Sequence, residues 1–227
     1  MDTPDLVPLL LAAIAFVGSH IGVSSTPLRP LLIARLGRGV YLGLYSLVSI
    51  LCLIWLVAAF AATPFLPLWP ETHWARWIAV ALMPLALILV AGGLSPANPT
   101  LLIHRAGGPT PRGVFAITRH PMMWGIALTA ILHLLASGDA ASLILCGAMA
   151  VLALVGAAFQ DRRKRTEDPA GWRVLAAETS FWPFQALAAG RTRLAPRALV
   201  LPVVAGLAAY LVMAAVHQNL FGGSPFH

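Results

Sequence analysis

Charged side chains are scarce in this sequence. Only 10% of its 227 residues are Asp, Glu, Lys or Arg, whereas a soluble domain carries about 25%. Hydrophobic residues make up 59% of the chain, and they occur in runs that approach ~20 residues, the length that a spanning helix needs. The strands of a membrane barrel would instead alternate over segments of about 10 residues. The composition excludes an ordinary soluble protein and predicts an all-α, polytopic membrane protein, built as a single integral membrane domain over residues 1–227.

Acidic residues are the rarer of the two charge types, with 8 Asp and Glu against 15 Lys and Arg, for a net charge of +7. In a membrane protein this excess marks cytoplasmic loops and contact with anionic lipid, so nucleic acid is not an expected partner. The apolar runs contain no carboxylate, which argues against an ion-coupled transporter. The two cysteines lie inside apolar runs and indicate no disulfide framework. P-loop, dinucleotide-binding, CxxC and HExxH motifs are absent.

Six apolar runs predict about six transmembrane helices, over residues 6–23, 41–62, 77–92, 121–136, 140–159 and 199–217. No basic segment precedes the first run, so we expect it to be retained rather than cleaved as a signal peptide. Basic residues gather in the loops after the first, third and fifth runs, and the tail after the sixth run has none. The positive-inside rule therefore predicts these three loops in the cytoplasm and both termini outside, in a bacterial inner membrane.

Two histidines, His20 and His133, fall within the apolar runs. An ionisable residue inside a span predicts a functional site by default, although a neutral imidazole can also join two helices by a hydrogen bond. Gly125, Thr129 and His133 are spaced four residues apart and form one helix stripe, and small residues also surround His20. Small residues beside histidines on two helices favour a planar cofactor such as haem, but they serve ordinary helix contact as well. His217 is interpreted as an interface residue.

An Arg-His-Pro turn, Arg119-His120-Pro121, opens the fourth run. Proline suits the first position of a helix, and a helix N-terminus favours anions. Arg119, together with Arg29 and Arg162 in the other basic loops, is a candidate to bind haem propionates, a phosphate or a nucleotide cofactor. For any single arginine the positive-inside rule is the better explanation, with the exception of Arg119, which lies at a helix N-terminus.

Helix geometry separates the candidate histidines. His120 and His133 are 13 residues apart, about 220° around a regular helix, so they should not bind one metal ion. His20 and His133 differ in predicted depth by roughly 10 Å at 1.5 Å per residue. Only tilt, a kink or shifted helix ends would bring these two to one iron.

Three patches of this sequence, spread over about residues 18 to 184, together carry a resemblance to a known family. They are Gly18-Ser19-His20 with Leu28-Arg29-Pro30 and Tyr45-Ser46-Leu47-Val48-Ser49; Thr118-Arg119-His120-Pro121 through His133-Leu134; and Asp161-Arg162-Arg163 with Thr179-Ser180-Phe181-Trp182-Pro183-Phe184. This set resembles the NnrU-type membrane proteins, a family that includes the plant cis-ζ-carotene isomerase. The resemblance implies an integral membrane haem b protein with His20 and His133 as iron ligands, and it suggests a link to denitrification and nitric oxide metabolism.

The Arg-His-Pro turn and the later aromatic-Pro segment are also similar to isoprenylcysteine carboxyl methyltransferases, which bind S-adenosylmethionine at that turn. The Glu-Glu pair typical of those enzymes is missing, since Glu167 and Glu178 are isolated. We interpret this likeness as one of fold more than of reaction.

Three functional hypotheses follow. The first is a haem-dependent isomerase or redox enzyme that acts on a small or apolar substrate in the bilayer, with His20 and His133 as metal ligands and catalytic residues. In it Arg119, Arg29 and Arg162 hold the cofactor's anionic groups, Gly125 and Thr129 flank it, and His120 lines the pocket or braces the turn. The second is an S-adenosylmethionine-dependent membrane methyltransferase. The third is a non-enzymatic haem or nitric oxide binding accessory protein of a respiratory complex. The sequence leaves a homo-oligomer open.

Overall fold

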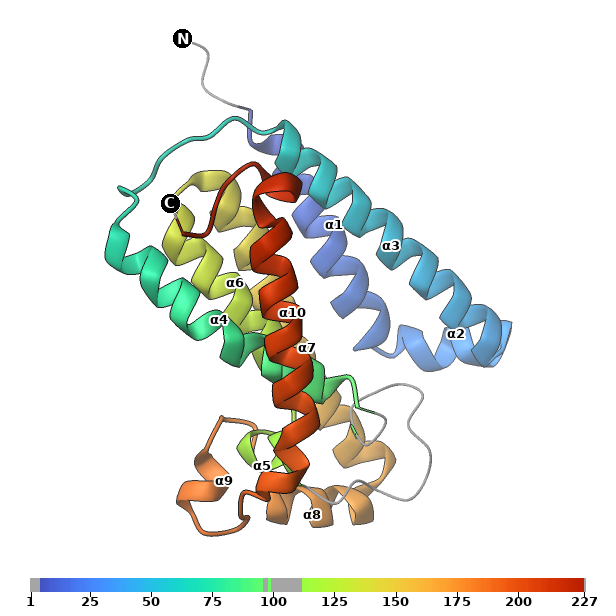
Figure 1. Cartoon of the computed structure of the whole chain (residues 1–227). Coiled ribbons are helices and arrows are strands. Elements are labelled where there is room, and N and C mark those ends of the chain that lie inside the picture. The colour runs from blue at the N-terminus through green and yellow to red at the C-terminus, as the bar shows by residue number, and fades with distance from the viewer. Residues whose placement is uncertain (1–4, 96–97, 99–111, 227) are drawn as a thin grey trace.

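The computed structural model describes residues 5–95, 98 and 112–226. This part of the chain is helical throughout (Figure 1), with no strand beyond an isolated bridge between Pro67 and Asp139. The prediction of an all-α fold is confirmed. The helices are α1 (Val7–Ser24), α2 (Leu28–Leu36), α3 (Arg38–Ala62), α4 (His73–Gly93), α5 (Val114–Ile117), α6 (Pro121–Ser137), α7 (Ala140–Glu167), α8 (Pro169–Glu178), α9 (Gln185–Ala188) and α10 (Pro196–Phe221).

Each predicted apolar run corresponds to one helix. Five of them, α1, α3, α4, α7 and α10, are long and apolar enough to cross a membrane. The fourth run forms α6, which has 17 residues and is shorter than those five. Several helices extend past the predicted ends, most clearly α7, which continues from residue 159 to Glu167. Charged residues end an apolar run without ending the hydrogen bonds of the helix, so hydropathy underestimates the helix length.

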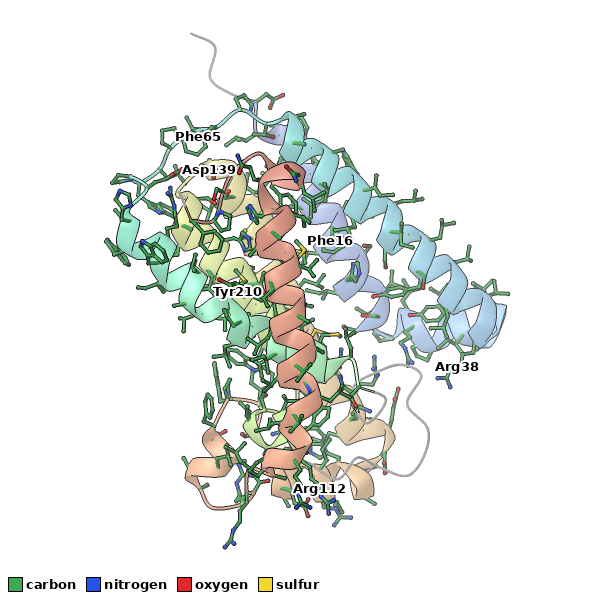
Figure 2. The ribbon with its side chains drawn as sticks, viewed as in Figure 1. Phe16, Arg38, Phe65, Arg112, Asp139 and Tyr210 are labelled. Atoms are coloured by element: carbon green, nitrogen blue, oxygen red, sulfur yellow. The ribbon has the colours of Figure 1, made fainter. Side chains whose placement is uncertain are left out.

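The helices form a bundle in which α7 joins two groups (Figure 1). On one side of α7 lies α1, which also packs against α3; on the other lies α6, which packs against α4, and α10 crosses α4. The start of α1 and the end of α10 lie at one end of the bundle, while α2, α5, α8 and α9 lie toward the other. Figure 2 shows Arg38 and Arg112 at the end with the short helices and Phe65 and Asp139 at the opposite end. Residues 99–111, in the predicted basic loop after the third run, lie outside the described residues.

The outer surface of the bundle is strongly apolar. Large hydrophobic side chains point outward along α3 and α10, and Leu201 on α10 is 77% exposed. The buried core is small by comparison and includes Leu9, Phe16 and Leu56 where α1, α3 and α7 meet. Soluble monomers rarely expose apolar surface on this scale, whereas helices that face lipid must do so. The chain is therefore built as a membrane protein.

Candidate functional site

The Arg-His-Pro turn is held in place by the aromatic-Pro segment that lies far away in the sequence. The hydroxyl of Thr118 donates to the carbonyl oxygen of Phe181 at 2.7 Å, and the backbone N–H of Arg119 donates to the carbonyl of Ser180 at 2.9 Å. The indole N–H of Trp124, one turn into α6, also donates to the carbonyl of Phe181, at 2.9 Å. These bonds join two of the three patches singled out in the sequence into one structural unit.

The other part of the third patch, which begins at Asp161, completes the same unit. The buried ring of His120 places its Nε2 2.6 Å from Oδ1 of Asp161, and Nη1 of Arg119 lies 3.6 Å from Oδ2 of the same carboxylate. The guanidinium of Arg119 also lies over the ring of Trp172, at 4.9 Å from the centroid. Burial lowers the pKa of Arg119, and the carboxylate of Asp161 opposes that effect. The charge of Arg119 is thus already paired, and His120 braces the turn from inside.

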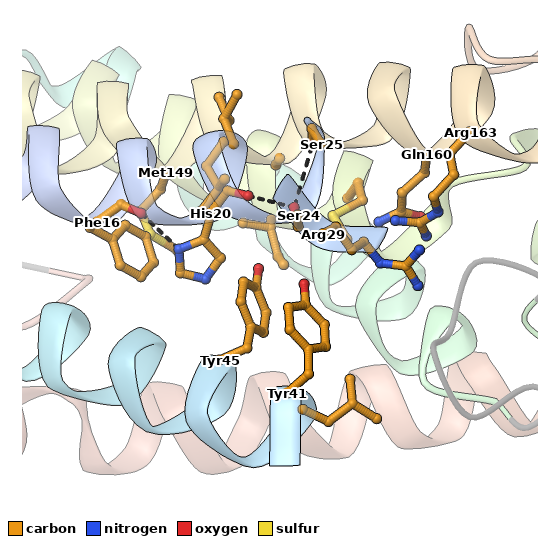
Figure 3. Close-up of a pocket in the computed structure, with 17 residues that line it drawn as sticks. Phe16, His20, Ser24, Ser25, Arg29, Tyr41, Tyr45, Met149, Gln160 and Arg163 are labelled. Carbon is orange, nitrogen blue, oxygen red and sulfur yellow. Dashed lines mark hydrogen bonds between the residues drawn. The ribbon is translucent and has the colours of Figure 1, made fainter. Parts of the chain in front are cut away.

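A cavity of about 280 Å³ lies between α1, α3, α6 and α7, beside the start of α2. Figure 3 shows its arrangement: His20, Tyr41 and Tyr45 point into it from α1 and α3, and the basic side chains of Arg29 and Arg163 lie together toward one end. The remaining walls are largely apolar. They are formed by Phe16, Ile21, Leu42, Met123, Ile126, Met149, Leu152, Ala153 and Gly156, with Ser24, Ser25 and Gln160 as further polar members.

His20 lies in this cavity in a defined orientation. Its Nδ1 is 2.7 Å from the carbonyl oxygen of Phe16, one helical turn earlier, and its ring meets the edge of Tyr45 at a centroid distance of 5.6 Å. Because a carbonyl only accepts hydrogen bonds, Nδ1 carries the proton and Nε2 keeps its lone pair. A neutral imidazole held in this way can bind a metal ion or accept a proton through Nε2.

His133 has the same local geometry at a different place. Its Nδ1 lies 2.9 Å from the carbonyl of Thr129, so its Nε2 also keeps a lone pair. The ring lies beside that of His217 on α10, with centroids 6.4 Å apart, and is not part of the cavity wall. The residues of α6 that line the cavity are Met123 and Ile126, and His133 lies roughly 10 Å beyond Ile126 along the helix at 1.5 Å per residue. His133 does not line the cavity that His20 lines, and the iron that the two would share stays a prediction.

Of the arginines predicted to bind the cofactor, some line the cavity and others do not. Arg29 lines the cavity and pairs with Glu167 at 3.2 Å, whereas Arg162 is exposed and points away from it. Its neighbour Arg163 lines the cavity instead, and sequence reasoning missed it. The signal was present in the helical phase of α7, because Arg163 shares one stripe, spaced by seven residues, with Met149 and Gly156.

Gly125 and Thr129 serve packing and backbone geometry. A Cβ placed on Gly125 would lie 2.6 Å from the carbonyl oxygen of Ala86 on α4, so the glycine permits close contact between α4 and α6. Thr129 contributes its backbone carbonyl to His133. The contact of Gly125 is thus one between helices, and the predicted cofactor contact of Thr129 stays a prediction.

The whole sequence was compared with known proteins and protein families. No curated protein and no solved structure matches it significantly. A family model described as NnrU protein matches residues 8–225. This match runs beyond the three sequence patches and takes in α10 with His217. Since it covers nearly the whole chain, the protein belongs to the NnrU family.

Proposed function

We propose that this protein binds haem b within the bacterial inner membrane, with His133 as an iron ligand and the end that carries α2, α5, α8 and α9 in the cytoplasm. One observation carries the proposal: His133 sits on an apolar helix with Nδ1 bonded to the Thr129 carbonyl and Nε2 free for a metal. A neutral imidazole is the usual protein ligand of haem iron.

The side chains present fit a haem better than a bare metal ion. Among the described residues no group of three or more His, Cys, Asp and Glu side chains lies close enough to hold a metal ion. Haem supplies four nitrogen ligands of its own and needs only one or two from the protein. When bound, it would supply one-electron chemistry and an iron that takes small ligands such as nitric oxide.

The cavity beside His20 is the proposed substrate site. Its apolar walls suit a small or apolar molecule that enters from the bilayer, and the basic pair Arg29 and Arg163 suits an anionic end of such a molecule. His20 would hold or accept a proton at Nε2. This assignment differs from the role that the family resemblance implies for His20, which is to bind the iron.

The methyltransferase hypothesis has weaker support. It requires Arg119 and His120 to bind S-adenosylmethionine, but both side chains are buried and engaged with Asp161. Neither contributes to the cavity. The accessory-protein hypothesis shares the haem and differs only in predicting no turnover.

An absorption spectrum of the purified full-length protein tests the proposal. We expect a Soret band and a pyridine haemochrome of type b in wild type, and loss of most of the bound haem in His133→Ala. His73→Ala, an exposed histidine at the start of α4, is the matched control and should keep the haem. Wild-type protein without a Soret band, or a His133→Ala variant with a full complement of haem, would overturn the proposal.

The variant His20→Ala separates the two assignments of this residue. If His20 lies in a substrate site, the variant keeps the Soret band of wild type. If His20 binds the iron, as the resemblance implies, the band shifts or disappears.

A further inference from the structure

A second cavity, of about 190 Å³, lies between α1, α2 and α3. It shares two lining residues, Tyr41 and Tyr45, with the cavity beside His20. We infer that this second cavity binds the hydrocarbon chain of an anionic single-chain amphiphile, such as a fatty acid, whose charged end is held by Arg29 and Arg163. The inference rests on the proposed substrate site and names the class of molecule that this site would take.

The walls of the second cavity suit hydrocarbon rather than a polar group. In the described part of the chain its polar side chains, apart from the two tyrosines, are Ser19 and Ser49. The hydroxyl of Ser19 donates to the carbonyl oxygen of Phe16 at 3.0 Å, and that of Ser49 donates to the carbonyl oxygen of Tyr45 at 2.7 Å. Both hydroxyls are thus satisfied by their own helices. The rest of the wall is aliphatic and consists of Val23, Leu32, Leu36, Leu44 and Val48.

The second cavity is large enough for a segment of chain and opens toward lipid. An apolar cavity of about 150 Å³ can hold benzene, so a cavity of about 190 Å³ holds a hydrocarbon segment of at least that size. Three of its wall residues, Leu36, Leu44 and Val48, are 41%, 50% and 45% exposed and belong to the apolar outer surface of the bundle. A chain can therefore enter from the bilayer without crossing water.

One face of α2 connects the two cavities. Arg29, Leu32 and Leu36 are spaced by three and four residues and therefore lie on one side of the helix. Arg29 lines the first cavity, whereas the two leucines line the second. Leu36 lies about 10 Å beyond Arg29 along the helix axis. The middle of an extended palmitate chain lies at about that distance from its carboxylate, so a carboxylate bound at Arg29 places its chain in the second cavity.

Tyr41 and Tyr45 form the wall that the two cavities share. Their rings are stacked, with centroids 6.0 Å apart and planes that differ by 20°. Figure 3 shows both rings projecting from α3, with Arg29 and Arg163 on the side of Tyr41. Aromatic rings present flat apolar faces, so the tyrosines give a hydrocarbon chain a surface to follow away from the basic end.

The basic end keeps positive charge available for the ligand. Nη1 of Arg29 lies 3.2 Å from Oε1 of Glu167, and Nε of Arg163 lies 3.8 Å from Oε2 of the same carboxylate. Two guanidinium groups thus share one carboxylate, which leaves one positive charge to be matched. A guanidinium has five N–H donors, so both arginines can bind a second carboxylate as well as Glu167. An anionic end group is therefore the partner that this cluster favours.

Photochemical labelling tests where a bound chain lies. Palmitate that carries a diazirine in the middle of its chain is added to the full-length protein in bilayer discs of phosphatidylcholine, and the labelled residues are identified by mass spectrometry after illumination. We expect labelling of the second cavity, on α2 and α3, that excess unlabelled palmitate reduces at least fivefold. Labelling of α10, where Leu201 is 77% exposed, reports contact with bulk lipid and serves as the internal reference.

Four variants connect the labelling to the residues of the site. Arg29→Ala with Arg163→Ala should lower labelling of the second cavity, relative to α10, at least fivefold. The matched control, Arg173→Ala with Arg193→Ala, removes the same charge from exposed residues and should change nothing. Arg29→Lys with Arg163→Lys keeps the charge and should retain most of the labelling, which separates lost binding from a folding defect. Val48→Trp fills the second cavity and should lower its labelling as far as the double alanine variant does.

The outcomes distinguish the inference from the proposed function. Binding of a fluorescent fatty acid that depends on Arg29 and Arg163, without labelling of the second cavity above that of α10, would overturn the inference and leave the substrate site in place. Binding that does not depend on the two arginines would overturn the substrate site and the inference with it. Neither result depends on the haem, which the absorption spectrum tests separately.

Discussion

Replacing Asp161 with alanine should destabilise the protein more than removing any other described carboxylate. Its side chain is 13% exposed and serves two partners, His120 at 2.6 Å and Arg119 at 3.6 Å, whose side chains are 0% and 10% exposed. Truncating one partner of a buried ion pair leaves the other charge uncompensated and costs about 3–5 kcal/mol. A domain of this size loses roughly 2–4 °C in Tm per kcal/mol, so we expect Tm to fall by roughly 6–20 °C.

Thermal unfolding can be followed by the labelling of the two cysteines. Cys52 and Cys146 are both partly buried, and unfolding exposes their thiols to a thiol-reactive fluorophore. Glu167→Ala is the matched control, because this carboxylate is 56% exposed and pairs with Arg29 at 3.2 Å. Exposed pairs contribute about 0–1 kcal/mol, so the control should lose only a few degrees. Equal losses of Tm in the two variants would refute the claim that the Asp161 cluster holds the turn.

Three further predictions concern the caps, the helix contact and the cavity. Asp139→Ala removes the N-cap of α7, whose carboxylate accepts from two backbone N–H groups at 3.0 Å, and should cost about 0.5–2 kcal/mol in the same thermal assay; a loss as large as that of Asp161→Ala would contradict the ranking. Gly125→Ala adds a Cβ 2.6 Å from the Ala86 carbonyl and should cost about 1–3 kcal/mol through overpacking, whereas an unchanged Tm would show that α4 and α6 can move apart freely. The double variant Arg29→Ala with Arg163→Ala should weaken binding of a fluorescent fatty acid anion at least tenfold and leave the Soret band in place, and equal affinity for wild type and variant would remove the anionic end from the proposed substrate.

Most of the fold could be predicted from the sequence because a bilayer imposes a simple rule on composition. A spanning helix must be apolar over about 20 residues, so each apolar run corresponds to a helix. Hydropathy does not predict the helices that lie outside the apolar runs. Helix α8, for example, begins with Pro169 at its first position after Asp168 has capped it through the backbone N–H of Gly171. These signals are local capping chemistry, and hydropathy does not register them.

The candidate site could be predicted in its parts but not in its pairings. Helical phase correctly separates His120 from His133, because both lie on one short segment of chain. It carries no information about which residue of another helix meets either ring. The partner of His120 is Asp161 and the ring neighbour of His133 is His217, and in each pair the two residues lie on different segments of the chain. Long-range partners of this kind require the tertiary structure.

The predicted difference in depth between His20 and His133 bears on the roles of the two histidines. Each of the two imidazoles has its Nδ1 beside a backbone carbonyl of its own helix, His20 at Phe16 and His133 at Thr129. The aromatic ring beside His133 is that of His217, with ring centroids 6.4 Å apart. His20 lines the cavity beside Tyr45, where the proposed substrate site would use a proton acceptor. The depth mismatch therefore agrees with the proposed division of roles, in which His133 binds iron and His20 faces the substrate.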